Sequence, residues 1–445
     1  MAKQVMNCGA SLSRAAMASW LLAFSAAAFS APELPKAEPE EVGMSSERLA
    51  KLKNYFDQEA EAGRLPGGVI AIARGGKLVM HETFGVQNPA KEGAMPNDAI
   101  FRVYSMTKPL VSVAAMQLVE DGVVQLTDPV SKWLPAFKDM KVSSAIKGAD
   151  GKTTYEQVPV KQEMIVQDLL RHTSGLVYGE INANEEVRQA YQAAGAYNPG
   201  GAEFDPRGVT PAEQVAAMAK APLGHQPGTV WEYSMSSDIL GRVVEAASGK
   251  TLGEFLNERV FAPLKMEDTG FYVPESKQSR LAESFEVDPW TNKKYPLLDV
   301  SVPPKNDSGG AGAVSTAMDY LRFSQMLLNG GELDDVQVLS PTTVKLMASD
   351  HLGDRASNPM NPGALLLGTP EGYTFGLGFL VRKDTGMAGV QGSVGEFMWA
   401  GYAGTFFWVD PEEELAVVLM TQQSGTSRAH YRRAMKNLVN QAIID

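Results

Sequence analysis

The sequence predicts an α+β fold in which one antiparallel sheet, flanked by helices, is built from both ends of the chain, with a helical domain inserted between them. Short apolar runs typical of strands lie near the N-terminus, at Val69–Ala73, and near the C-terminus, in YTFGLGFLV, FMWAGY, TFFWV and LAVVLMT. The long middle carries helical patterns separated by Pro-Gly turns. Strands at both ends that enclose helices indicate a single sheet to which both termini contribute.

The composition is typical of a folded, loop-rich globular protein. The 445 residues are 44% hydrophobic and 21% charged, and they include 42 Gly and 26 Pro without a collagen-like period. This excludes a wholly disordered chain and leaves ample length for a core. The formal net charge is −12, from 40 basic and 52 acidic residues, and no basic run occurs. Nucleic acid and anionic membrane are therefore not expected as main partners.

Residues 1–30 are predicted to be a secretory signal peptide. A basic start with Lys3 and Arg14 precedes an apolar stretch over 15–29, and Ala28 and Ser30 fit the small-residue positions before a cleavage site. The stretch is too short and too rich in alanine for a good membrane span; an N-terminal amphipathic helix is the alternative. The only cysteine lies in this segment, so the mature protein would have no disulfide. We expect a periplasmic or secreted bacterial protein with no stable membrane insertion.

The mature chain is predicted to be one domain over 31–445 that begins with a helix and a hairpin. Ser45 offers an N-cap to a helix with apolar residues at helical spacing up to Phe56. Two apolar runs on either side of Gly75 and Gly76 are typical of a β-hairpin. A helix containing Ala434, Leu438 and Ala442 closes the chain. We place the sheet part at about 41–104 and 306–445, and the helical part at about 105–305.

A Ser-x-x-Lys motif ahead of a strongly apolar helix is the first candidate for chemistry. Ser105 and Lys108 precede the segment PLVSVAAMQLVEDG, which is apolar on nearly every face and ends at Gly122, so this helix is expected to be buried. Pro109 is tolerated only in the first turn, which places Ser105 at the helix N-terminus. Unpaired backbone amides there favour developing negative charge. Lys108 lies on the same face and could accept the serine proton.

Two further features bear on this motif. Ser144 and Lys147 repeat the spacing but precede a polar, turn-rich segment with no buried helix, so we reject this copy. Tyr233 lies in a loop just ahead of a helix that begins near Ser236, where its phenol could project into a cleft. The alternatives are an N-cap serine beside an exposed lysine at Ser105, and a core tyrosine with a satisfied hydroxyl at Tyr233.

Five segments, in this order, resemble the serine β-lactamase and penicillin-binding-protein superfamily. They are SMTK at 105–108, LLRHTSGL at 169–176, HQPGTVWEYS at 225–234, GGAGAVSTAMDYLRF at 309–323 and WAG at 399–401. Within the superfamily the chain is most similar to the class C β-lactamase-like carboxylesterases, called family VIII. The resemblance spans roughly Glu41 to the C-terminus and implies a β-lactamase/transpeptidase-like fold for the catalytic domain.

The resemblance also implies a role for each matching residue. Ser105 would be the nucleophile that becomes acylated, and Lys108 its proton acceptor. Tyr233 would pass a proton to the leaving group and later activate water. The backbone N–H groups of Ser105 and Tyr402, the latter just after Gly401, would form the oxyanion hole, which stabilises the tetrahedral intermediate.

Two departures from the family pattern favour ester substrates. No Lys-Ser/Thr-Gly occurs in the chain, so the cation that receives a substrate carboxylate in β-lactamases and D-peptidases is missing. Trp399 stands at that place, in a sequence similar to the Trp-Gly-Gly of the esterases, and an indole would make an apolar wall. Met235 occupies the position of the Asn in the Tyr-x-Asn of β-lactamases. Both changes point to neutral acyl esters.

Other catalytic classes lack a signature. No G-x-S-x-G elbow occurs, none of the five histidines has a local triad pattern, and no H-E-x-x-H or Cys/His cluster offers a metal site. The glycines of 309–312 do not match a dinucleotide-binding fingerprint and are interpreted as a flexible rim loop.

We therefore predict a serine hydrolase, free of cofactor and metal, that cleaves short-chain carboxylic esters of small molecules through an acyl-enzyme on Ser105. One alternative is a β-lactamase, D-peptidase or linear-amide hydrolase of the same superfamily. The other is a catalytically silent homologue that binds the cell wall.

Overall fold

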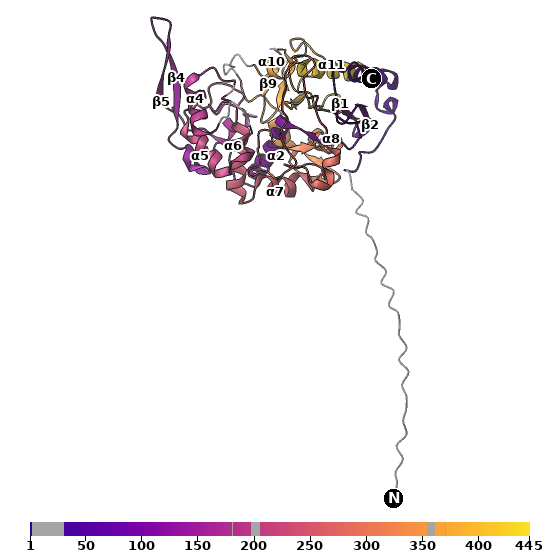
Figure 1. Ribbon diagram of the computed structural model, residues 1–445, viewed down its shortest axis with the longest axis horizontal. Helices are drawn as coiled ribbons and strands as arrows, with labels where there is room; N and C mark the ends of the chain where they lie inside the picture. Colours follow the sequence, from indigo (N-terminus) through magenta and orange to yellow (C-terminus); the bar gives the residue numbers. More distant parts are fainter. Residues whose placement is uncertain (2–30, 180, 197–204, 354–360, 370) are drawn as a thin grey trace.

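Both ends of the chain contribute to one seven-stranded sheet in the computed structural model, which describes residue 1 and residues 31–179, 181–196, 205–353, 361–369 and 371–445 (Figure 1). Every strand is antiparallel to its neighbours. In spatial order the strands are β2 (Lys77–Gly85), β1 (Gly67–Arg74), β13 (Leu415–Thr421), β12 (Phe406–Asp410), β11 (Phe397–Ala400), β10 (Leu380–Arg382) and β9 (Tyr373–Phe375). The predicted α+β fold class is confirmed.

Helices cover both faces of this sheet. Successive side chains of a strand point to opposite faces. On β12, the Phe407 ring lies 5.0 Å from the Tyr320 ring of α8, while the neighbouring Trp408 ring lies 4.6 Å from the Lys436 Nζ of α11. Helices α8 and α11 therefore pack on opposite faces, and α1 packs beside α11 and β2. Their bounds are α1 (Ser46–Glu61), α8 (Ala317–Leu328) and α11 (Arg428–Asn440).

A helical part lies between the two sheet-forming ends. Its buried centre is α2, which packs against α6 and α7. Its helices are α2 (Thr107–Glu120), α3 (Val166–Leu170), α4 (Glu185–Ala194), α5 (Pro211–Lys220), α6 (Ser236–Ser248) and α7 (Leu252–Leu256). Two short antiparallel strand pairs lie outside the seven-stranded sheet. They are β3 (Phe101–Arg102) with β6 (Val314–Ser315), and β7 (Glu332–Leu333) with β8 (Val336–Gln337). Two further helices are α9 (Pro341–Met347) and α10 (Pro362–Leu367).

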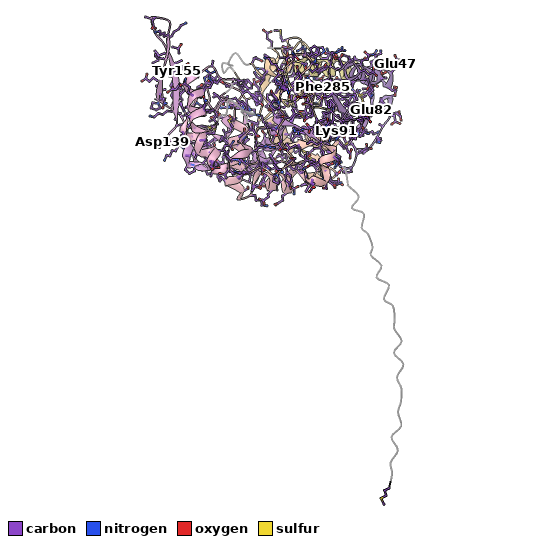
Figure 2. All side chains as sticks on the ribbon, in the orientation of Figure 1. Glu47, Glu82, Lys91, Asp139, Tyr155 and Phe285 are labelled. Atoms are coloured by element: carbon purple, nitrogen blue, oxygen red, sulfur yellow. The ribbon has the colours of Figure 1, made fainter. Side chains whose placement is uncertain are left out.

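One hairpin stands apart from the body of the molecule. Strands β4 (Lys141–Lys147) and β5 (Thr153–Pro159) pair with each other and project beyond α4, with Tyr155 on the projecting part (Figures 1 and 2). Most of their side chains are exposed. The rejected Ser-x-x-Lys copy lies on β4, where Lys147 is exposed. The polar, turn-rich segment predicted after Lys147 is thus the turn of this hairpin, and no buried helix follows it directly.

The local predictions for the N-terminal part are confirmed. The Ser45 hydroxyl caps α1 by accepting from the Arg48 N–H at 3.3 Å. The turn between β1 and β2 contains Gly75 and Gly76, whose φ angles of 57° and 73° favour glycine. The predicted signal peptide covers residues 1–30, and residues 2–30 lie outside the described part of the chain. Within the described part of the chain, every helix falls short of the length and apolarity needed to cross a membrane.

Candidate active site

Ser105 sits in a single 3-10 turn, Tyr104–Met106, that runs directly into α2. Tyr104 has a φ of 45°, a left-handed conformation that a bulky residue adopts only when its surroundings enforce it. Two hydrogen bonds hold Tyr104 in this conformation. Its carbonyl accepts from the Thr107 hydroxyl at 2.6 Å, and its hydroxyl accepts from the Leu298 N–H at 3.0 Å. The strained turn leaves Ser105 half-buried between fully buried neighbours.

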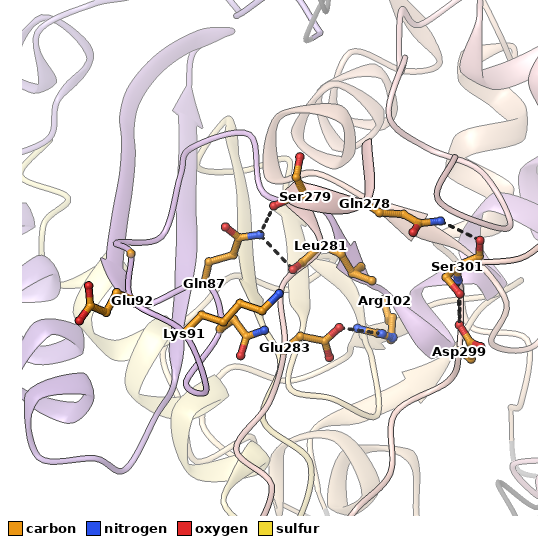
Figure 3. Close-up of a pocket in the computed structure, with 12 residues that line it drawn as sticks. Gln87, Lys91, Glu92, Arg102, Gln278, Ser279, Leu281, Glu283, Asp299 and Ser301 are labelled. Carbon is orange, nitrogen blue, oxygen red and sulfur yellow. Dashed lines mark hydrogen bonds and ion pairs between the residues drawn. The ribbon is translucent and has the colours of Figure 1, made fainter. Parts of the chain in front are cut away.

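Arg102, two residues before this turn, is anchored to the same distant loop. The Arg102 side chain donates from Nε to the Leu298 carbonyl at 2.5 Å and from Nη1 to the Ala282 carbonyl at 3.0 Å. Its Nη2 pairs with Glu283 at 3.2 Å, at the wall of a polar pocket (Figure 3). Loop 282–298 therefore holds the chain at both Arg102 and Tyr104, just ahead of Ser105.

The buried helix predicted after Ser105 is confirmed. Every residue of α2 from Thr107 to Leu118 is buried, and Pro109 lies in its first turn. Lys108 is 1% exposed, which excludes the alternative of an exposed lysine beside an N-cap. A helix buried on all sides holds its first turn rigidly, so Lys108 is fixed relative to Ser105.

The Ser105 hydroxyl lies where two functional side chains converge. The Tyr233 hydroxyl donates to Ser105 Oγ at 2.6 Å, and Lys108 Nζ donates to the same atom at 3.2 Å. Lys108 Nζ also donates to the Tyr178 hydroxyl at 3.2 Å and to the Gly310 carbonyl at 2.7 Å. These three contacts hold Lys108 Nζ in one position beside Ser105 Oγ. The structure thus brings together the three side chains that the sequence singles out.

Aromatic rings surround Tyr233 just ahead of α6. The rings of His172, Tyr178 and Trp399 lie 5.1, 5.3 and 5.5 Å from the Tyr233 ring. Lys108 Nζ lies 4.6 Å from the centre of the Tyr233 ring, within reach of a cation–π attraction. Packing of this kind fixes the plane of the phenol, so its hydroxyl is aimed at Ser105.

His172 supports the segment that carries Tyr233. Its carbonyl accepts from the Glu232 N–H at 2.9 Å, and its Nδ1 lies 3.1 Å from the Ser234 hydroxyl. Burial and the nearby positive charge of Lys108 hold the pKa of His172 well below its ordinary value, so the imidazole is neutral. His172 is therefore a neutral side chain that packs against the Tyr233 ring and forms a hydrogen bond with Ser234. Helix α3 ends at Leu170, just before Arg171 and His172 of the LLRHTSGL segment.

The glycine-rich segment 309–312 is buried, so the prediction of a flexible rim loop is wrong. The physical reason is close packing: a Cβ on Gly310 would lie 2.2 Å from Asp238 Oδ2, and one on Gly309 would lie 2.4 Å from the Ser237 carbonyl oxygen. Asp238 accepts from the Ser308 hydroxyl at 2.7 Å, and burial raises the pKa of its carboxyl against the opposing charge of Lys108. The segment thus brings the Gly310 carbonyl to Lys108.

The turn after β11 lies against the turn that carries Ser105. Trp399, on β11, is 1% exposed and packs between Tyr233 and Phe375, so the indole lies behind the phenol. A Cβ on Gly401 would lie 2.5 Å from the Val103 carbonyl oxygen. The Tyr402 ring lies 5.5 Å from the Tyr104 ring.

Gly401→Ala is expected to lower both activity and stability. The added methyl would lie 2.1 Å from Thr405 Oγ1 as well as against the Val103 carbonyl, so the turn has to move. Overpacking of this kind costs about 1–3 kcal/mol. Thermal unfolding and kcat on a p-nitrophenyl ester measure the effect. Gly386→Ala is the control, because its Cβ would meet only Asp384 at 3.8 Å; equal behaviour of the two variants would contradict the prediction.

Sequence reasoning missed two partners of Lys108. Tyr178 follows the LLRHTSGL segment, but no spacing rule connects a tyrosine there with a lysine 70 residues earlier. The Gly310 contact is made by a backbone carbonyl, which no side-chain pattern can reveal. The run of glycines at 309–312 was the only signal in the sequence for this contact. It was interpreted as a flexible loop, whereas the structure packs it closely.

Comparisons with known proteins agree with this geometry. A family profile described as Beta-lactamase matches residues 52–440. An uncharacterized protein of Mycobacterium tuberculosis is 34% identical over 81% of this chain and 87% of its own length. Esterase EstB of Burkholderia gladioli is 29% identical over 84% of this chain and 90% of its own. Among solved structures, EstCE1, a hydrolase with promiscuous acyltransferase activity, has a TM-score of 0.71 at 27% identity, and the match covers 88% of this chain and 98% of that one.

The resemblance inferred from the five sequence segments is therefore confirmed. The profile spans both sheet-forming ends and the helical part between them, so the match extends well beyond the Ser-x-x-Lys motif. The chain belongs to the Beta-lactamase family, in the serine hydrolase superfamily that also contains esterases such as EstB.

Proposed function

We propose that the protein hydrolyses carboxylic esters of small molecules through an acyl-enzyme on Ser105. The observation that carries the proposal is the convergence of the Tyr233 hydroxyl and Lys108 Nζ on Ser105 Oγ, at 2.6 and 3.2 Å. A serine becomes nucleophilic when an adjacent base takes its proton, and both groups are within proton-transfer distance.

The proposed reaction has two halves. Ser105 Oγ attacks the ester carbonyl carbon as its proton passes to the neutral amine of Lys108, and Tyr233 hands a proton to the departing alkoxide, which leaves as the alcohol. Water then gives a proton to the Tyr233 phenolate and attacks the acyl carbon. Lys108 returns its proton to Ser105 Oγ, which leaves as the hydroxyl, and the acid is released. The N–H groups of Ser105 and Tyr402 stabilise the oxyanion in both halves.

The aromatic environment supports neutral ester substrates over anionic amides. The residue at the place of the missing strand lysine, Trp399, contributes an indole that packs on Tyr233. Ser234, next to Tyr233, is turned into the core, where its hydroxyl meets His172 and Ser236. The similarity to an esterase of Burkholderia gladioli supports the same substrate class.

Substrate panels and active-site labelling test the proposal together. Wild-type protein is expected to turn over p-nitrophenyl acetate and butyrate far faster than nitrocefin or a D-Ala-D-Ala peptide, and a fluorophosphonate probe is expected to label Ser105. Ser105→Ala, folded by circular dichroism, is expected to take no label. Faster turnover of nitrocefin or the peptide would favour the amide-directed alternative. Folded wild-type protein that takes no label and turns over no ester would favour the silent, cell-wall-binding alternative.

A further inference from the structure

The carbonyls of Gly401, Tyr402 and Ala403, in the turn that follows β11, all accept hydrogen bonds. The Gly401 carbonyl accepts from Arg432 Nη2 at 2.7 Å and from the Gly404 N–H at 3.2 Å. The Tyr402 carbonyl accepts from Arg428 Nη1 at 2.9 Å, and the Ala403 carbonyl accepts from the Gln423 N–H at 2.7 Å. Two of these three carbonyls are thus held by guanidinium groups of α11.

The orientation of one peptide plane follows from these contacts. The described residues contain no cis peptide bond, and in a trans peptide the C=O and the N–H point in opposite directions. The Gly401 carbonyl points to Arg432 on α11, so the Tyr402 N–H of the same peptide points away from α11. β11 packs against the turn with Ser105, and a Cβ on Gly401 would lie 2.5 Å from the Val103 carbonyl oxygen, so this peptide lies next to that turn.

The two arginines are unusual in their surroundings. Arg428 and Arg432 lie one helical turn apart, and among the described residues neither forms an ion pair with a carboxylate. Burial and the neighbouring charge of Arg428 hold the pKa of Arg432 well below its ordinary value. Burying a cation without an acidic partner costs stability, and Arg432 has the Leu366 and Gly401 carbonyls as its acceptors instead.

We propose that Arg432 is a positioning residue for the oxyanion hole, which holds the Gly401–Tyr402 peptide so that the Tyr402 N–H faces the reacting acyl oxygen. The inference rests on the proposed ester hydrolysis through Ser105. A charged donor on the carbonyl fixes the peptide plane and also polarises it, which makes the N–H a stronger donor. The positive charge lies on the far side of the peptide, where it stabilises the developing oxyanion without contacting the substrate.

Arg432→Met and Arg432→Lys test this role, with Arg433→Met as the matched control. Methionine retains an unbranched side chain but removes the charged donor. Arg433 is the next residue of α11 and donates to the Leu367 carbonyl instead. The measurements are kcat and KM for p-nitrophenyl butyrate, the inhibition constant of a phenylboronic acid, whose tetrahedral adduct on a serine places an oxygen in the oxyanion hole, and the thermal unfolding midpoint.

In Arg432→Met, kcat is expected to fall by about 10- to 100-fold, because losing one oxyanion donor outright costs about 10²–10³-fold. KM is expected to change by less than about twofold, as for an interaction made mainly in the transition state. The boronate inhibition constant should rise by the same factor as kcat/KM falls. Arg432→Lys should lie between wild type and Arg432→Met, and Arg433→Met should match wild type in all three values.

The proposal is overturned if folded Arg432→Met keeps wild-type kcat, or if its loss lies in KM while boronate binding is unchanged. Should Arg432→Met fail to fold, a folded Arg432→Lys variant with wild-type kcat and boronate affinity overturns it equally. Failure of the proposed ester hydrolysis gives a different result from failure of the Arg432 proposal. In that case the wild-type protein would not turn over the ester, or Ser105→Ala would retain the turnover.

Discussion

Replacing Lys108 by methionine is expected to lower kcat for p-nitrophenyl butyrate by about three orders of magnitude, within the 10²–10⁴-fold typical of a general base. Methionine keeps a long unbranched side chain in a fully buried site, but it removes the group that contacts Ser105 Oγ at 3.2 Å. The substrate is not expected to touch Lys108 directly, because the amine already meets Tyr178 and Gly310. KM should therefore change little while kcat falls.

Steady-state kinetics of Lys108→Met and Lys147→Met check this prediction side by side. Lys147 belongs to the second Ser-x-x-Lys copy, on the exposed β4–β5 hairpin, so its replacement should leave kcat and KM at wild-type values. Near-UV circular dichroism verifies that both variants are folded. A folded Lys108→Met variant whose kcat is within tenfold of wild type would remove Lys108 from the proposed mechanism.

Glu396→Gln is expected to lower the free energy of unfolding by about 3–5 kcal/mol, as for other buried ion pairs that lose one partner. Glu396 is 0% exposed, and its two carboxylate oxygens accept from Arg382 Nε and Lys436 Nζ, each at 2.6 Å. Arg382 belongs to β10 and Lys436 to α11, so one carboxylate joins the sheet to the helix behind it. A neutral amide would leave two buried cations with no acid between them and would turn an N–H₂ towards one of them.

Urea denaturation followed by tryptophan fluorescence measures this loss. Glu258→Gln is the matched control, because Glu258 pairs with Lys250 at the exposed surface, where ion pairs contribute less than about 1 kcal/mol. The midpoint should shift strongly for Glu396→Gln and scarcely for Glu258→Gln. Equal shifts in the two variants would show that the buried triad contributes no more than a surface pair.

The sequence alone was sufficient for features that depend on neighbours along the chain. Ser105 and Lys108 are three residues apart, which brings the amine back to the Ser105 hydroxyl, and Pro109 confines the helix start to their position. The apolar run after Pro109 predicts burial, and α2 is buried as expected. The α1 cap at Ser45 and the β1–β2 hairpin follow from equally local signals. The order of five segments was enough to indicate the family.

Tertiary structure decided the contacts between residues that are distant in the chain. Tyr178 and the Gly310 carbonyl reach Lys108 from 70 and 202 residues away, and Arg432 reaches the Gly401 carbonyl across 31 residues. Hydrophobic periodicity carries no information on such pairs, because it reports only which face of an element is buried. The glycines of 309–312 show the same limit: a glycine permits both flexibility and close approach of the backbone, and only the atoms packed against it, here Asp238 and the Ser237 carbonyl, determine which of the two the fold uses.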